Sequence, residues 1–183
     1  MANKFEWKNI IMPAIAVFAA AADLITKYLV VLNLTFHQPV RFIGDVWRWT
    51  YTYNVGITFG MLSNLDAAWR PVILVITALI ALGVVIYFYR NLSKYIKDGR
   101  PQDFGRVALM AIIGGAFGNI IDRAYNGFVV DFIDWGLNDQ IRWYTFNVGD
   151  ACVVCGSITL AILFLFFEKP QRDKKPDIKQ ETV

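Results

Sequence analysis

The sequence has 183 residues, which is the length of a single domain. Charged residues make up 18% of it and its mean hydropathy is +0.42, whereas soluble domains typically carry about 25% charge. These values indicate a membrane protein. The net charge of +3 comes from local basic clusters that are not interleaved with aromatic residues, so a nucleic-acid partner is excluded.

Four apolar segments have the length that crosses a bilayer, which takes roughly 20 residues. They occupy about residues 10–32, 71–89, 104–122 and 150–167. The third is continuously apolar only over 107–121 and reaches spanning length if Arg106 extends toward the interface. The sequence therefore predicts an all-α membrane protein with four transmembrane helices in one domain, residues 1–168.

The first segment has an alternative interpretation. Lys4 and Lys8 precede an apolar run that contains "AAAA" at 19–22, a pattern also typical of a cleaved signal peptide. Apolar residues resume after Asp23 and continue to Leu32, which favours a retained helix of spanning length.

Basic residues predict the orientation. They gather before the first segment, in the loop 90–106 and after the fourth segment. The positive-inside rule then places both termini in the cytoplasm and the loops 33–70 and 122–149 outside. The tail 169–183 is basic and polar and is expected to be disordered.

The first outer loop carries its own pattern. In "VWRWTYTYN" (46–54) aromatic residues alternate with polar ones, which predicts an amphipathic strand with an aromatic face on the outer membrane surface. An aromatic belt without a binding role fits the spacing equally well. Residues 57–68 are expected to form a short interfacial helix. His37, the only histidine, is interpreted as a surface residue.

Two cysteines, Cys152 and Cys155, lie three residues apart in an apolar run. This spacing suits neither a disulfide framework nor a zinc site, which needs more ligands. They are interpreted as small apolar side chains that face lipid or a neighbouring helix.

Several polar residues interrupt the spans. Asp23 and Lys27 are four apart on one helix face, and a structural ion pair between them is favoured over a catalytic role. Near the outer end of the third helix, strong polar side chains follow one another and suggest a hydrogen-bonded site; these are Asn119, Asp122 and Arg123. Gly114 and Gly118 in the same segment are interpreted as helix-packing residues.

The topology brings Asp122, Asp131 and Asp150 to the outer ends of the third and fourth helices. Asn147 could cap the fourth helix with Asp150 as its third residue, and Asp131 and Asp134 could be solvated loop acids. Alternatively, two of the acids form an aspartic dyad, in which one ionised carboxylate activates water and one protonated carboxyl polarises a peptide carbonyl.

Five motifs resemble, in order and spacing, those of the bacterial lipoprotein signal peptidases, or signal peptidase II: "DLITK" (23–27), "NVGITFG" (54–60), "GGAFGNIIDR" (114–123), "VVDFID" (129–134) and "FNVGD" (146–150). The resemblance implies an inner-membrane aspartic endopeptidase that removes signal peptides from prolipoproteins, cutting before a cysteine that carries diacylglycerol. It also implies an outer strand region that forms a cradle at the membrane surface.

The resemblance assigns roles by position. Asp131 and Asp150 match the catalytic dyad, and Asp23 and Lys27 match a structural motif. The substrate-binding or supporting positions are Asn54, Gly56, Asn119, Asp122, Arg123 and Asn147. The implied partners are lipid-modified prolipoproteins, membrane lipids and the cyclic peptide inhibitor globomycin; neither metal nor cofactor is implied.

Two departures from the family pattern concern the size of side chains beside the site. Gly149 stands where alanine is frequent, and Ile57 and Thr58 stand where small residues are frequent. They leave inhibitor fit and substrate preference open. Because Asp150 lies near the positive end of a helix, we expect it to be the ionised base and Asp131 to be protonated. The competing hypotheses are a small transporter or channel and a non-catalytic lipoprotein-binding protein.

Overall fold

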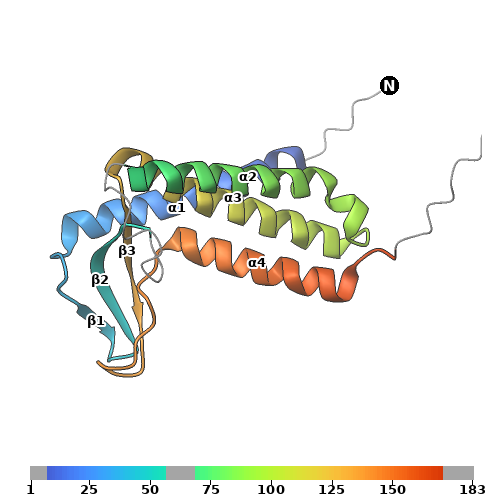
Figure 1. Ribbon diagram of the computed structural model, residues 1–183. Coiled ribbons are helices and arrows are strands. Elements are labelled where there is room, and N and C mark those ends of the chain that lie inside the picture. Colours follow the sequence, from blue (N-terminus) through green and yellow to red (C-terminus); the bar gives the residue numbers. More distant parts are fainter. Residues whose placement is uncertain (1–7, 57–68, 171–183) are drawn as a thin grey trace, which may run out of the picture.

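The computed structural model describes residues 8–56 and 69–170. Four helices lie alongside one another, α1 (Lys8–Asn33), α2 (Trp69–Tyr95), α3 (Arg100–Asn126) and α4 (Val148–Phe167), with a small sheet at one end (Figure 1). Each helix is long and apolar enough to cross a membrane. The predicted four-helix membrane fold is confirmed. The expected interfacial helix over 57–68, including Ile57 and Thr58, lies outside the described residues, as does the tail from residue 171.

The helices extend beyond the apolar segments that predicted them. α2 continues to Tyr95, and α3 begins at Arg100 with Pro101 in its first turn and ends where Gly127, at φ 78°, donates its N–H to the Arg123 carbonyl. Such ends are fixed by backbone conformation, which hydropathy does not report. The tail 169–183 was expected to be disordered throughout, but its first residue is held in place. The Lys169 N–H donates to the Tyr95 carbonyl at the end of α2, at 2.7 Å.

α3 is the central helix and packs against each of the other three. Its glycines allow close approach: a Cβ at Gly114 would meet Ala16 and Ala19 of α1, and one at Gly115 would meet Gly149 and Cys152 of α4. Lipid tails are as apolar as the side chains of these helices, so the hydrophobic effect does not drive the helices together. Close backbone packing is then a main source of helix association. The glycines therefore set the spacing of α1, α3 and α4.

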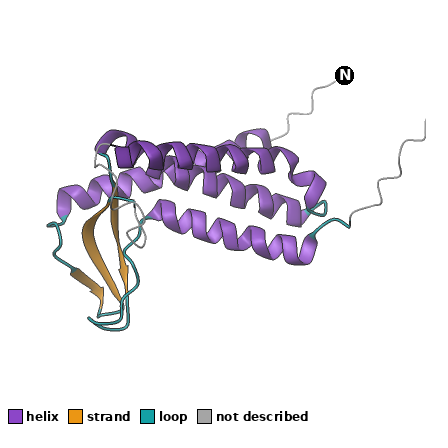
Figure 2. Cartoon of the chain, viewed as in Figure 1, coloured by secondary structure: helices purple, strands orange, loops and turns teal. Residues whose placement is uncertain are grey.

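The sheet stands across the end of the bundle where α1 and α3 finish and α4 begins (Figure 2). It is antiparallel in the order β1 (Val40–Ile43), β2 (Trp47–Asn54) and β3 (Val129–Trp135). The strand predicted over 46–54 is confirmed as β2. β3 was not expected, and it places Asp131 inside a strand rather than in a loop.

The aromatic residues of β2 do not share a single face, contrary to the prediction. Trp49 pairs with Ile133 and Thr52 with Asp131, so a bulge adds one residue to β2 between these pairs. Trp47 and Trp49 therefore project to one side, and Tyr51 and Tyr53 to the other. The rings contact one another in the same two groups.

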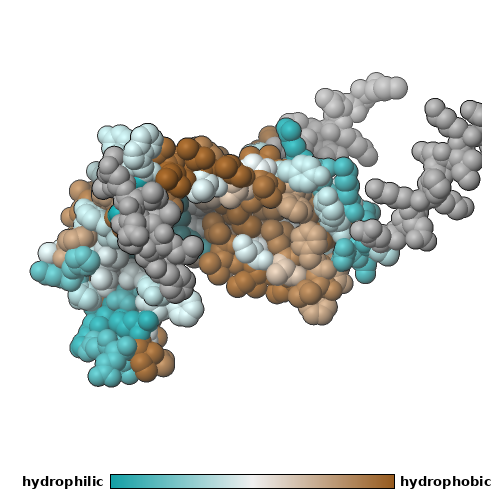
Figure 3. Space-filling view, in the orientation of Figure 1, coloured by the Kyte–Doolittle hydropathy of each residue, from teal (hydrophilic) through white to brown (hydrophobic). Residues whose placement is uncertain are grey.

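A buried apolar cluster attaches the sheet to α1. It contains Tyr51 of β2, Val30 of α1, and Val130, Phe132 and Ile133 of β3. In the space-filling view, hydrophobic colours run along the helices and hydrophilic colours occupy both ends of the molecule (Figure 3). The sheet is thus held at one polar end of an apolar bundle.

Replacing Gly114 by leucine should weaken the bundle. The added side chain would meet the Ala16 carbonyl oxygen, and its Cβ would lie 2.7 Å from the Ala19 Cβ, so α1 must move away from α3. Overpacking of this kind costs about 1–3 kcal/mol. Thermal unfolding in detergent should show a lowered Tm for Gly114→Leu. The matched control is Gly83→Leu in α2, where an added Cβ meets nothing within 4 Å. Equal Tm values for the two variants would contradict the close packing of α1 on α3.

Candidate active site

The start of α4 is built by a reciprocal pair of hydrogen bonds. Asn147, the N-cap, accepts the Asp150 N–H on its Oδ1 at 2.8 Å, and Asp150 Oδ2 accepts the Asn147 N–H at 3.3 Å. This capping box satisfies backbone donors that a helix leaves unpaired at its first turn. The predicted cap is confirmed, and it fixes the Asp150 carboxylate in the first turn of α4.

Asn147 also reaches the second acid. Its Nδ2 donates to Asp131 Oδ1 at 2.6 Å, so one fully buried amide contacts Asp131 while capping the turn that carries Asp150. The other oxygen of Asp131, Oδ2, accepts from Asn54 Nδ2 at 2.8 Å. Asn54 lies two residues along β2 from Thr52, the residue paired with Asp131, which brings it diagonally across the ladder.

Asp131 is a buried carboxyl, exposed by only 2%, and is not a solvated loop acid. Burial, and after it the nearby charge of Asp150, raise the pKa of Asp131 to about 7, although the hydrogen bonds from Asn54 and Asn147 act in the opposite direction. A carboxyl with this pKa can hold its proton at neutral pH and donate it.

A buried ammonium group lies behind the two acids. Lys27 Nζ lies 2.6 Å from Asp23 Oδ2, 2.7 Å from Asn119 Oδ1 and 3.1 Å from Asp122 Oδ2. Asp23 is fully buried and Lys27 is 2% exposed. The predicted Asp23–Lys27 pair is confirmed, and it is the centre of a larger network.

Each partner of Lys27 extends toward Asp131 or Asp150. Asn119 turns its oxygen to Lys27 and so directs its Nδ2 to Asp150 Oδ1, at 2.8 Å. Asp23 Oδ1 accepts the Gly149 N–H of α4 at 2.7 Å. Asp122 Oδ2 accepts the Val130 N–H, next to Asp131, at 3.3 Å. The network therefore orients both acids through their own chain segments.

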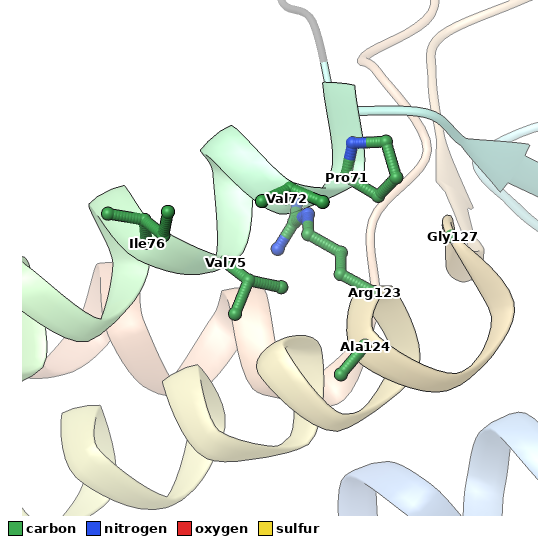
Figure 4. Close-up of a pocket in the computed structure, with 7 residues that line it drawn as sticks. All are labelled: Pro71, Val72, Val75, Ile76, Arg123, Ala124 and Gly127. Atoms are coloured by element: carbon green, nitrogen blue, oxygen red, sulfur yellow. The ribbon is translucent and has the colours of Figure 1, made fainter. Parts of the chain in front are cut away.

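Arg123 reaches from α3 to α2 beside the site. Figure 4 shows its side chain between the two helices, next to Pro71, Val72 and Val75, where a pocket of about 300 Å³ lies. Its positive charge interacts with those of Asp150, Asp131 and Asp122. Within the part of the chain that is described, its buried Nε has no hydrogen-bond partner.

Gly56 closes the site next to Asn54. Its N–H donates to Asn54 Oδ1 at 2.8 Å, and its φ of 89° is a conformation that other residues rarely adopt. A Cβ there would collide with Leu74 and lie 3.5 Å from Arg123 Nε. Both the backbone conformation and the contact with Leu74 therefore favour glycine at position 56. All six predicted supporting residues are brought around Asp131 and Asp150.

A cleft of about 780 Å³ opens from this site. Its polar end is lined by Asn54, Gly56, Asn119, Arg123 and Asp150. Below that end the lining is apolar and comes mainly from α2 and α4, including Leu82, Val85, Phe88, Val153 and Leu160. Asp150 therefore faces a cleft that continues along membrane-spanning helices, and Asp131 lies behind the lining residue Asn54, to which it is hydrogen-bonded.

Asp134 differs from the expectation of a surface acid. It is 6% exposed, lies 2.7 Å from Arg142 Nε and accepts a hydrogen bond from Thr50 Oγ1 at 2.8 Å. Its partners come from β2 and from the segment after β3, so spacing could not reveal them. The run "FVVDFIDW", rich in β-branched and aromatic residues, is a signal by which β3 could have been predicted.

The histidine and the two cysteines lie as expected. His37 is exposed, and Cys152 and Cys155 are free thiols, half-buried and exposed respectively. Across residues 8–56 and 69–170, no three His, Cys, Asp or Glu side chains are grouped as metal ligands. The chemistry available at the site is that of two coupled carboxyls with amide and guanidinium donors beside them, an arrangement able to act as acid and base on one substrate.

Comparisons with known proteins agree with this arrangement. The family model described as signal peptidase (SPase) II matches residues 15–166. The lipoprotein signal peptidase of Francisella tularensis subsp. novicida (strain U112) is 36% identical over 155 residues, covering 85% of this chain and 91% of that protein. The enzyme of Clostridioides difficile (strain 630) is 36% identical over 159 residues, covering 86% and 97%.

Two solved structures, both described as bacterial membrane enzymes, share the fold. One has a TM-score of 0.70 at 29% identity and covers 85% of this chain and 93% of its own. The other has a TM-score of 0.69 at 28% identity and covers 94% of each chain. Because the family model matches the sheet and most of each described helix, this chain belongs to the signal peptidase II family.

Proposed function

We propose that this protein is a membrane aspartic endopeptidase that removes signal peptides from prolipoproteins, cutting before a cysteine that carries diacylglycerol. The observation that carries the proposal is the pairing of Asp131 and Asp150 through hydrogen bonds to Asn147, with Asp150 at the polar end of an apolar cleft. Family membership supports the substrate class. A substrate anchored by acyl chains would present its scissile bond at the depth where this cleft becomes polar.

The two carboxyls take opposite roles. Asp150, in the first turn of α4 and hydrogen-bonded by Asn119, is assigned as the ionised base, because the helix N-terminus favours a negative charge. Asp131, buried with its pKa raised to about 7, is assigned as the protonated acid.

Hydrolysis then proceeds in two steps. Asp150 removes a proton from water as its oxygen attacks the carbonyl carbon, while Asp131 donates its proton to the carbonyl oxygen. In the second step the C–N bond breaks, Asp150 gives its proton to the leaving amine, and the hydroxyl of the intermediate returns a proton to Asp131. Asn54, Gly56 and Arg123 line the cleft beside this reaction and are proposed to position the substrate.

The proposed membrane is the bacterial inner membrane, with both termini in the cytoplasm. The end of the bundle remote from the sheet carries Lys8, Lys94, Lys97, Arg100 and Lys169. This basic end is assigned to the cytoplasm and the sheet to the outer surface. Membrane lipids would contact the apolar band of Figure 3, and globomycin is proposed to occupy the cleft at the dyad.

Replacing either acid by asparagine should abolish cleavage. General acid and base groups typically contribute about 10²- to 10⁴-fold to rate, so Asp131→Asn and Asp150→Asn should each lose at least that much activity. The assay is the mobility shift of a purified diacylglyceryl prolipoprotein as its signal peptide is lost. Asp139→Asn, an exposed partner of Arg48, is the matched control and should cleave at the wild-type rate. Wild-type cleavage by either dyad variant would refute the two-carboxyl mechanism.

Activity should fall as the pH rises through the pKa of Asp131. Because the acid must be protonated in the free enzyme, kcat/KM should decrease about tenfold per pH unit above about 7. A pH profile of peptide cleavage measures this limb. A profile that is flat to about pH 9 would contradict the assignment of Asp131 as the acid.

The same pKa predicts a stability difference. Between about pH 4 and 7 the folded protein retains a proton on Asp131 that the unfolded chain has lost, so this residue's stabilising contribution falls as the pH rises and levels off above about 7. Asp131→Asn lacks that contribution. The Tm difference, wild type minus variant, should therefore decrease across this window in detergent.

A cysteine at position 93 should report the orientation. Ser93 is exposed near the end of α2, in the part assigned to the cytoplasm. In intact cells and a background without Cys152 and Cys155, Ser93→Cys should resist a membrane-impermeant thiol reagent. Gln140→Cys, exposed beyond β3, should react readily. The opposite labelling pattern would invert the topology.

A further inference from the structure

Two large aromatic side chains lie at the outer mouth of the cleft and have no role in the mechanism above. Trp143 and Tyr144 are 74% and 73% exposed, and both line the cleft that contains Asp150. Among the described residues, neither ring stacks on another aromatic ring, and neither the indole N–H nor the phenol O–H has a hydrogen-bond partner. Exposed aromatic rings beside a reactive group commonly serve recognition.

The backbone that carries these rings is anchored. Trp143 N–H donates to the Trp135 carbonyl at 2.8 Å, and Phe146 N–H donates to the Ile133 carbonyl at 3.0 Å, so the segment runs along the edge of β3. Immediately before it, the Arg142 side chain pairs with buried Asp134. The rings are therefore presented on a fixed support, which lowers the entropic cost of binding a ligand.

The cleft has two chemically distinct zones. Its deeper part is lined by aliphatic and phenylalanine side chains of α2 and α4, which suit acyl chains or an apolar peptide. At the mouth, Trp143 and Tyr144 add ring surface together with one hydrogen-bond donor each. Such rings favour the membrane interface, where apolar chains join polar ester groups.

We infer that Trp143 and Tyr144 recognise the glycerol ester groups of the diacylglyceryl cysteine, with the indole N–H and phenol O–H donating to ester carbonyl oxygens. The inference rests on the proposed function and names the part of the substrate, the ester groups, that these two residues bind. An apolar segment of the signal peptide would need no donors, and the aliphatic lining below would serve it as well.

The test uses two lipobox peptides that differ only in the lipid linkage. One carries an S-diacylglyceryl cysteine with ester bonds, and the other carries the dialkyl ether analogue, which lacks the carbonyl oxygens. The enzymes are wild type, Trp143→Phe, Tyr144→Phe and the double variant. Each conservative change keeps a ring and removes one donor. The control is Tyr125→Phe, which removes the hydroxyl of a 90% exposed tyrosine outside the cleft lining.

Wild type and Tyr125→Phe should prefer the ester substrate in kcat/KM. One lost hydrogen bond is worth roughly 2- to 10-fold, so each single variant should lose about that factor on the ester substrate and stay within about twofold on the ether. The double variant should bring the ester-to-ether ratio close to one. Activity on the ether substrate shows that each variant is folded.

Three results would overturn the inference. The wild type could cleave both substrates equally, the ester-to-ether ratio could remain unchanged in the variants, or both substrates could lose activity equally, which would assign the rings to the peptide. The proposed function is tested separately by wild-type cleavage of the ester substrate and its loss in Asp131→Asn. A wild type that cleaves neither peptide would refute that function and this inference with it.

Discussion

The buried ammonium group of Lys27 is the constraint on which the rest of the site depends. A charge removed from water is tolerated only when its surroundings compensate it, and here the compensation comes from three oxygens on two helices. Because Asp23 also binds the start of α4 and Asp122 the start of β3, satisfying one charge fixes four elements relative to one another. The positions of the two acids at the sheet end of the bundle therefore depend on the network around Lys27.

Asn147 shows how an ordinary stabilising device can also shape a site. Its side-chain oxygen caps α4, as in many helices, and this leaves its amide nitrogen to donate to Asp131. Structural capping and the pairing of the acids are therefore not competing interpretations. The bond that begins the helix also holds the second carboxyl near the first turn, where Asp150 lies.

The features that depend on nearby residues were predicted correctly from the sequence. Hydropathy predicted four helices, a spacing of four predicted the Asp23–Lys27 pair, and the Asn147–Asp150 spacing predicted the cap. The ion pair and the cap each depend on residues within one helical turn, and the four helices depend on the apolar character of residues that face lipid. The family motifs then pointed to the same group of polar residues that the structure brings together.

Features that depend on distant partners were not predicted. The burial of Asp134 requires Arg142 from a returning segment and Thr50 from another strand, and the placement of Asp131 requires pairing with β2. Hydropathy reported the apolar part of each helix but not its capped ends, because hydrogen bonding decides these. Spacing along one segment carries no information about register between segments.

The bulge in β2 decides which side chains of the strand face Asp131. With the extra residue, Asn54 projects to the same side as Asp131 and the tyrosines project away. If β2 continued from Trp49 without the bulge, Tyr51 would lie opposite Asp131 and every later side chain of β2 would project to the opposite side. Tyr53 would then take the place of Asn54 and bring a phenol ring against the buried carboxyl. The parity of a short strand, rather than a motif, thus decides whether an amide or an aromatic ring faces the acid.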